Sequence, residues 1–305
     1  MSGSGDPARA PGNVAPAADD EATLNVAPSA SAAPADAAEP APPRTEPERR
    51  TGTAPPAAAG PGGLVSAAVT HPGAVRSRNE DSFVDRPDLG LWAVADGAGG
   101  HGAGDYAANA VREALDSIPP GLSAAEMLAQ LRLRLAAVNA ALREEAARRG
   151  PGRVIASTVV ALLARGDHFA CLWAGDSRAY LLRGGVLQRL SRDHSLVQEL
   201  IDQGAIGEAE AEDHPQGNVI TRAVGAAPTL ELDKVTGRVV PGDRFLLCSD
   251  GLIRVVREAE IAEALAAAGD AAEALVRLAV ERGARDNVTV IALARPGGGP
   301  AAGGA

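Results

Sequence analysis

The sequence reads LWAVADG at residues 91–97 and FLLCSDG at residues 245–251. Each apolar run has the length and composition of a buried β-strand, and each ends in Asp-Gly. Asp-Gly is also a common hairpin turn, so either aspartate taken singly has a plain structural explanation. Burial of a carboxylate at the end of an apolar strand is nevertheless costly unless a partner compensates for its charge.

Further acidic residues stand at the ends of other apolar runs. Asp286 comes just before VTVIAL, the pair Glu80 and Asp81 opens DSFV, and Asp176 follows HFACLW. If these strands are neighbours, their ends converge, the like charges repel, and a divalent cation would relieve the repulsion. Carboxylates, a main-chain carbonyl and water suit Mg²⁺ or Mn²⁺ better than Zn²⁺, and the sequence has no Cys/His cluster of zinc spacing.

Each of two further residues can be interpreted either as part of a catalytic site or as an ordinary surface residue. Arg76 precedes the Glu80-Asp81 pair and offers the planar donor that a phosphate dianion requires, although a lone arginine is more often a solvated charge. His101 ends the glycine cluster of residues 97–102 and is either a general acid or a surface histidine. This cluster lacks the Lys-Ser/Thr ending of a P-loop, which excludes a nucleotide loop of that kind.

The order of expected elements indicates the fold class. Strands are expected at 64–71, at 81–96 on either side of a turn, in a meander over 157–191, at 243–249 and at 286–294. Helices are expected at 105–117, at 123–149 behind a Ser123/Glu126 capping box, from Asp193 through 201, near 257–267 and at 271–282 behind Asp270. Residues 204–222 are polar and irregular, as in a mobile flap. Segregated strands and helices favour an α+β sheet sandwich covered by helices over alternating βαβ units.

Composition divides the chain into three parts. Residues 1–62 are rich in Pro, Ala and Gly with almost no large apolar residue, which predicts a disordered tail, followed by a domain at 63–296 and a flexible end at 297–305. The net charge of −10 disfavours a nucleic-acid partner. The sequence has no membrane-spanning run and no secretory signal, and Cys171 and Cys248 lie in apolar runs, so a cytoplasmic location is expected.

Eight segments in order resemble the PPM/PP2C family of metal-dependent protein phosphatases in its bacterial form. They are GAVRSRNEDSF, LWAVADGAGGHGAGDYAA, STVVALLA, WAGDSRAYLLRGG, LQRLSRDHSLVQEL, NVITRAVG, GDRFLLCSDGL and DNVTVIAL. The resemblance spans about 64–293 and implies a central sandwich of two antiparallel β-sheets flanked by α-helices on both sides. A stretch of this similarity, CLWAGDSRAYLLRGG with DHSLVQELIDQGAI, also resembles phosphatases that accompany type VI secretion kinases.

The resemblance also implies a role for each site residue. Two Mn²⁺ or Mg²⁺ ions are expected, with a third bound weakly. The implied ligands are Asp96 bridging two ions, the Gly97 carbonyl, Asp250 and Asp286 on the first ion, Glu80 near the second, and Asp176 with Asp250 on the third. Asp81 is expected to support the site, and Arg76 to bind the substrate phosphate.

One position departs from the family pattern. Ala98 stands after Asp96-Gly97, where bacterial relatives often have Met and eukaryotic ones His. A histidine acid is therefore absent there, so His101 or a metal-bound water is expected to protonate the leaving group.

The sequence thus predicts a phosphatase that hydrolyses phosphoserine and phosphothreonine in proteins, by attack of water activated by two metal ions. Its expected partners are phosphoproteins and a cognate Ser/Thr kinase, and it is expected to be a monomer. Two alternatives are a non-catalytic scaffold that binds phosphoproteins and a hydrolase of small phosphoesters with the same metal site. The presence of every expected metal ligand speaks against the scaffold.

Overall fold

Two antiparallel sheets form the centre of the structure, a computed structural model that describes residues 48–50, 61, 63–100, 102–212 and 214–297. The first sheet has the order β1 (Glu48–Arg50), β2 (Val65–His71), β12 (Val288–Ala294), β11 (Arg244–Cys248), β8 (Arg178–Arg183) and β9 (Val186–Arg189). The second has the order β10 (Asp233–Arg238), β7 (His168–Ala174), β6 (Val159–Arg165), β4 (Leu91–Ala98) and β3 (Asp81–Arg86), with β5 (Ala156–Ser157) paired to β4.

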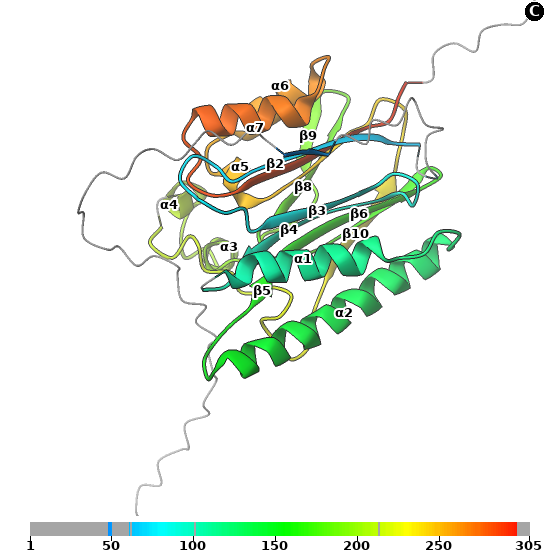
Figure 1. The fold of residues 1–305 in the computed structure, drawn as a ribbon. Helices are drawn as coiled ribbons and strands as arrows, with labels where there is room; N and C mark the ends of the chain where they lie inside the picture. The colour runs from blue at the N-terminus through cyan, green and yellow to red at the C-terminus, as the bar shows by residue number, and fades with distance from the viewer. Residues whose placement is uncertain (1–47, 51–60, 62, 101, 213, 298–305) are drawn as a thin grey trace, which may run out of the picture.

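Helices cover both outer faces of the sandwich (Figure 1). The second sheet packs against α1 (Ala103–Asp116) and α2 (Ala124–Arg149), and the first packs against α6 (Glu258–Ala266) and α7 (Ala271–Glu281). Three short helices complete the described part, α3 (Leu196–Asp202), α4 (Glu208–Glu212) and α5 (Asp250–Ile253). The α+β class and the α-β-β-α layering predicted from the sequence are confirmed.

Strand β4 shows how the layers are held together. Leu91, Ala93 and Ala95 pack into the cluster that contains α1 and α2, whereas Trp92 and Val94 pack into the cluster between the two sheets. Side chains alternate across a strand, so a strand with both faces buried must be apolar throughout. The run LWAVA meets this requirement, and its first polar residue marks the place where the strand leaves the core.

Helix α2 begins as its sequence predicts. The Ser123 hydroxyl accepts a hydrogen bond from the Glu126 amide at 3.3 Å, and the Glu126 carboxylate accepts one from the Ser123 amide at 2.8 Å. The prediction at Asp270 is confirmed as well, since its carboxylate accepts from the Glu273 amide at 3.1 Å and starts α7. Both contacts satisfy amides that the first turn of a helix leaves without partners.

The cap predicted for α3 is wrong. Ser195 is the N-cap, and its hydroxyl accepts from the Gln198 amide at 3.3 Å. Asp193 instead binds Arg178 at 2.7 Å and Arg189 at 2.6 Å, two guanidinium groups that bind its charge more strongly than a helix amide would. Within residues 204–222, expected to be irregular, the short helix α4 forms.

The N-terminal prediction needs a correction at three residues. Glu48–Arg50 pairs antiparallel with Ala68, Val69 and Thr70 of β2, so this part of the expected tail is a strand. Residues 1–47, 51–60 and 62, and residues 298–305 of the expected flexible end, lie outside the described residues. Among the helices that are described, none combines the length and apolar character needed to cross a membrane.

Candidate metal centre

Five aspartates gather at one end of the sandwich. Asp81 begins β3 and lies directly opposite Asp96 near the end of β4. Asp250 follows β11, Asp286 precedes β12, and Asp176 lies in the turn between β7 and β8. Antiparallel pairing brings the end of β11 beside the starts of β12 and β8, so all five residues reach the same edge.

Burial and neighbouring charge raise the pKa of three of these aspartates, Asp81, Asp96 and Asp176. Burial raises the pKa of Asp96 well above its usual range, and the charges of Asp81, Asp250, Asp176 and Asp286 raise it further, in that order. Burial and the nearby Asp250 raise the pKa of Asp81 to about 7 and that of Asp176 to about 8. Carboxylates in such a cluster hold protons unless a cation takes their place.

Three of these carboxylates have an oxygen with no partner. Asp81 Oδ1, Asp176 Oδ1 and Asp250 Oδ1 are buried and accept no hydrogen bond from any residue that the structure describes. A buried carboxylate oxygen without a donor is costly, because nothing replaces the water that it lost. Oxygens of this kind suit a Mg²⁺ or Mn²⁺ ion, so the donor set fits the metals predicted from the sequence.

Two arginines already bind the cluster. Arg254 donates to Asp250 Oδ2 from Nε at 2.8 Å and from Nη2 at 2.6 Å, and Arg76 Nη2 donates to Asp286 Oδ2 at 3.0 Å. Within the described part of the chain, no three His, Cys, Asp or Glu side chains form a ready-made set of metal ligands. One oxygen each of Asp250 and Asp286 is bound by an arginine. A metal ion at this place would therefore need main-chain carbonyls and water as further ligands, and small rotations of the aspartate side chains.

A main-chain carbonyl is available at Gly97. The Gly97 amide donates to the Glu80 carbonyl at 3.1 Å, which holds the end of β4 beside the start of β3. A Cβ atom built on Gly104, at the start of α1, would lie 2.5 Å from the Gly97 carbonyl oxygen and 2.9 Å from Glu80 Oε2. The two oxygens therefore border one small space, which agrees with a joint role for Gly97 and Glu80 in metal binding.

Burial raises the pKa of Glu80, and Asp105 raises it further. The sequence prediction that Glu80 belongs to the site is thus compatible with its surroundings, where a cation would again favour the ionised form. Gly104 and Asp105, which border this acid from α1, were not recognised from the sequence.

A chain of hydroxyl groups holds Asp81 in place. Asp81 Oδ2 accepts from Ser249 Oγ at 2.8 Å and from Thr289 Oγ1 at 2.7 Å. Thr289 Oγ1 also lies 2.7 Å from Thr70 Oγ1, and Thr70 Oγ1 accepts from Asn79 Nδ2 at 2.7 Å. With Asp81 ionised, each hydroxyl donates toward it, so one oxygen is fixed and the other is left for the site.

Sequence analysis missed these supporting residues. Ser249 and Thr289 each interrupt an otherwise apolar run beside a predicted ligand, and this was the available signal. Asn287 was missed too. Its Oδ1 accepts from the Glu80 amide at 2.8 Å, and its Nδ2 donates to the carbonyls of Pro72 and Arg78 at 3.0 and 2.8 Å. No sequence pattern identifies a side chain that binds a loop 207 residues away.

Arg76 lies at the rim of the cluster. Its side chain is 43% exposed while it binds Asp286, so a ligand can reach the guanidinium from solvent. His101 lies outside the described residues, and its role as a general acid stays a prediction.

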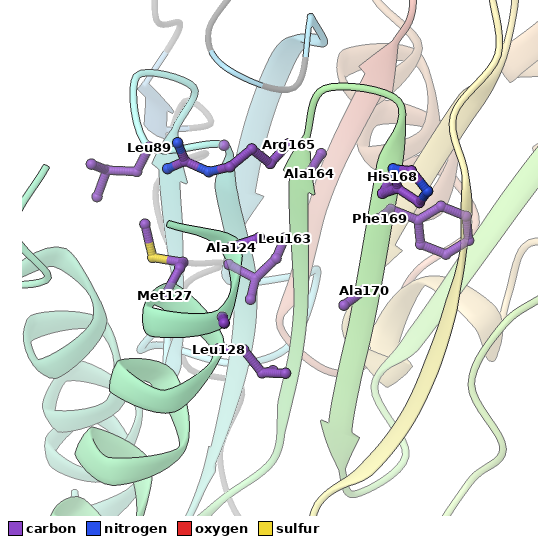
Figure 2. A pocket seen from close by; sticks show the side chains of 12 residues that line it. Leu89, Ala124, Met127, Leu128, Leu163, Ala164, Arg165, His168, Phe169 and Ala170 are labelled. Atoms are coloured by element: carbon purple, nitrogen blue, oxygen red, sulfur yellow. The ribbon is translucent and has the colours of Figure 1, made fainter. Parts of the chain in front are cut away.

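A cavity of about 230 Å³ lies away from this edge, beside the start of α2 and the β6–β7 hairpin (Figure 2). Leu89, Met127, Leu163 and Phe169 line it, and no carboxylate does. It lies at the opposite end of β4 and β6 from the aspartates and is separate from the metal centre.

The profile of the protein phosphatase 2C family matches residues 74–282, which include the acidic pair of β3 and the ends of β4 and β11. The chain belongs to the protein phosphatase 2C family. The relatives and solved structures that it matches are described as serine/threonine phosphatases, and the catalytic domain of one of them was solved with two manganese ions.

Curated relatives of this family support the same assignment. The serine/threonine protein phosphatase PstP of Mycobacterium tuberculosis is 37% identical over 230 residues, which cover 74% of this chain and 44% of PstP. The chain therefore matches less than half the length of PstP. The serine/threonine phosphatase Stp of Listeria monocytogenes is 35% identical over 236 residues, which cover 74% of this chain and 94% of Stp.

Solved structures share the fold at similar identity. PppA, described as a key regulatory component of the type VI secretion system in Pseudomonas aeruginosa, has 45% identity and a TM-score of 0.71, with 76% of this chain and 97% of PppA covered. The catalytic domain of PstP, solved with two manganese ions, has 36% identity and a TM-score of 0.66, with 76% of this chain and 97% of that domain covered.

Proposed function

We propose that this protein hydrolyses phosphoserine and phosphothreonine in protein substrates and opposes a cognate Ser/Thr kinase. The observation that carries the proposal is the set of buried, unpartnered carboxylate oxygens on Asp81, Asp176 and Asp250, close to an exposed arginine. Asp96, the Gly97 carbonyl, Asp250 and Asp286 would hold one divalent ion, and Asp96 with Glu80 a second. The manganese pair in the PstP catalytic domain supports this number.

Bound Mn²⁺ or Mg²⁺ supplies a water of lowered pKa and neutralises negative charge on the phosphate. The chain supplies orientation. Arg76 leaves Asp286 and forms paired hydrogen bonds with two phosphate oxygens, which a planar guanidinium does better than an ammonium group. Asp81 keeps a fixed carboxylate because Ser249 and Thr289 donate to it. His101 is retained as a proposed proton donor to the leaving serine or threonine oxygen.

The substrate class is tested by comparing kcat/KM on a phosphopeptide and on a small phosphomonoester, with Mn²⁺ and with EDTA. The proposal expects turnover that needs the ion and prefers the phosphopeptide. Binding of the phosphopeptide without hydrolysis would indicate the scaffold alternative, and a preference for the small ester would indicate a metabolite phosphatase.

The similarity to PppA supports a narrower proposal, that the kinase opposed by this protein regulates type VI secretion. Comparison of the phosphoproteomes of wild-type and Asp250→Asn strains tests it. Phosphosites on secretion proteins should accumulate in the variant, and a change confined to unrelated proteins would contradict the proposal.

We also propose that the protein works in the cytoplasm, as a monomer, and without a nucleic-acid partner. Cys171 and Cys248 are buried free thiols, in keeping with a reducing compartment, and the net charge of −10 opposes binding to phosphate backbones. Fractionation and light scattering of the full chain test the location and the oligomeric state.

A further inference from the structure

We propose that Arg254 serves as a built-in cation of the metal centre, paired with Asp250 in the place of a third divalent ion that Asp250 and Asp176 would otherwise bind. This inference rests on the proposed metal-dependent function and goes beyond it, because it assigns to a side chain of this protein a role that the family resemblance gives to an ion.

The short helix α5 places Arg254 over Asp250. One helical turn separates the two residues, and the Arg254 amide donates to the Asp250 carbonyl at 3.2 Å. Residues four apart on a helix lie on the same face, so the Arg254 guanidinium lies within direct reach of the Asp250 carboxylate. The position is set by the backbone, and the pairing does not depend on a flexible loop.

Arg254 binds one carboxylate oxygen of Asp250 and does not bind the other. Both Nε and Nη2 donate to Oδ2, at 2.8 and 2.6 Å, while Oδ1 is buried without a partner. A carboxylate can bind one ion through each of its two oxygens. Asp250 therefore keeps Oδ1 for a principal ion, whereas Arg254 covers the oxygen that a further ion would use.

Asp176 is the second carboxylate near this guanidinium. Its side chain is 6% exposed, its Oδ1 accepts no hydrogen bond, and the charge of Arg254 acts on it. The nearby Asp193 is already bound by Arg178 and Arg189 and does not draw Arg254 away. Arg254 thus neutralises part of the negative charge that would otherwise attract an ion to Asp176 and Asp250.

The side chain of Arg254 is also 41% exposed, so it can leave Asp250 when a competing ion is abundant. A third ion would then have to displace a positive charge tethered nearby. An arginine a few ångströms from an aspartate lowers the pKa of that carboxyl by about 1–3 units, and an electrostatic effect of this size corresponds to at least about tenfold weaker binding of a competing third ion.

The test is a Mn²⁺ titration of the full chain by calorimetry, with bound ions counted independently by electron paramagnetic resonance. Wild type should bind two ions tightly, and Arg254→Met, which keeps the length of the side chain without its charge, should bind a third at least about tenfold more tightly than wild type does. Arg254→Lys should resemble wild type. Asp176→Asn added to Arg254→Met should remove the gained ion.

A matched control is Arg282→Met, which breaks another arginine–carboxylate pair, with Glu260 at 2.6 Å, on the helices that cover the first sheet. It should leave the isotherm unchanged. An isotherm of Arg254→Met identical to that of wild type would overturn the inference, whether two or three ions bind. A wild-type chain that binds no Mn²⁺ would instead contradict the proposed function.

A second measurement guards against a variant that simply folds poorly. In EDTA, Arg254→Met should have a lower Tm than wild type, because Asp176 and Asp250 lose their cation. Mn²⁺ should raise its Tm by more than it raises that of wild type. An equal or smaller rise would count against the inference.

Discussion

Asp81 and Asp96 face each other across the β3–β4 pairing; Asp81 is buried, Asp96 is partly buried, and the pKa of each is raised. Facing carboxylates in a sheet repel each other, and burial strengthens the repulsion. The fold keeps this arrangement although an apolar pair would be more stable there. This edge of the sandwich is therefore built for a ligand that carries positive charge.

Asp96→Asn should stabilise the ion-free protein and abolish catalysis. The amide cannot ionise, so folding no longer has to bury a charge or take up a proton at this position, and urea denaturation in EDTA should show a higher midpoint than wild type. Loss of a bridging ligand should lower kcat/KM by at least about 100-fold, because metal ions contribute several kcal/mol to transition-state stabilisation. Full Mn²⁺-dependent activity in this variant would contradict the proposed site.

The ion-free protein should become less stable as pH rises. Asp81 and Asp176 titrate at 3.8 when unfolded but at about 7 and about 8 when folded, so the folded state holds more protons between these values. The free energy of unfolding should then fall between about pH 4 and about pH 8. Urea titrations in EDTA across this range measure the slope, and saturating Mn²⁺ should flatten it by displacing the protons. A slope that is unchanged by Mn²⁺ would contradict this reading.

Thr289→Val should weaken the support of Asp81. The variant keeps the shape of the buried side chain but removes a hydroxyl that donates at 2.7 Å to a carboxylate, at a cost of about 2 kcal/mol. Thr289→Ser keeps the hydroxyl donor, so it should lower the stability of the folded protein less than Thr289→Val does. The order of the three urea midpoints in Mn²⁺ checks this, and a serine variant as unstable as the valine variant would show that the methyl group matters more.

Gly97→Ala should disrupt the site through its backbone. The new Cβ would lie 1.9 Å from the Gly104 carbonyl oxygen, so β4 and α1 must separate, at a cost of about 1–3 kcal/mol. Gly100→Ala is the matched control, since its Cβ would approach only Arg153 Nη1, at 3.8 Å. Thermal unfolding and Mn²⁺ affinity should change in the first variant and stay near wild type in the second.

Arg76→Lys should impair substrate binding more than stability. Its pairing with Asp286 is exposed on both sides and contributes less than about 1 kcal/mol. A lysine cannot form the paired contact with phosphate, so KM for a phosphopeptide should rise about tenfold while the urea midpoint stays constant. A fall in kcat with unchanged KM would place Arg76 elsewhere in the mechanism.

The elements whose signals are local could be predicted from the sequence. LWAVA had to be a two-sided strand, and Ser123 with Glu126 fixed the start of α2. The prediction failed at α3, because the arginines that bind Asp193 come from other strands. It also missed β10, since DKVTGR has one large apolar residue and becomes a strand by pairing with β7.

In the candidate site, too, features with a local signal could be predicted from the sequence, and features that depend on distant residues could not. Aspartates at the ends of apolar runs were visible in the sequence, but their meeting depends on how β3, β4, β11 and β12 are ordered in space. Arg254 was invisible for a different reason. An arginine four residues after an aspartate is common on helices, and only the burial of Asp250 and its closeness to Asp176 give this one a distinct meaning.

The four strands that supply these acids belong to different layers. Asp81 and Asp96 come from one sheet and Asp250 and Asp286 from the other, while Ser249 and Thr289 of the latter hold Asp81 of the former. The proposed catalytic site therefore depends on the alignment of two separately hydrogen-bonded sheets. A shift of one sheet relative to the other would separate Ser249 and Thr289 from Asp81 while leaving the hydrogen bonds inside each sheet intact.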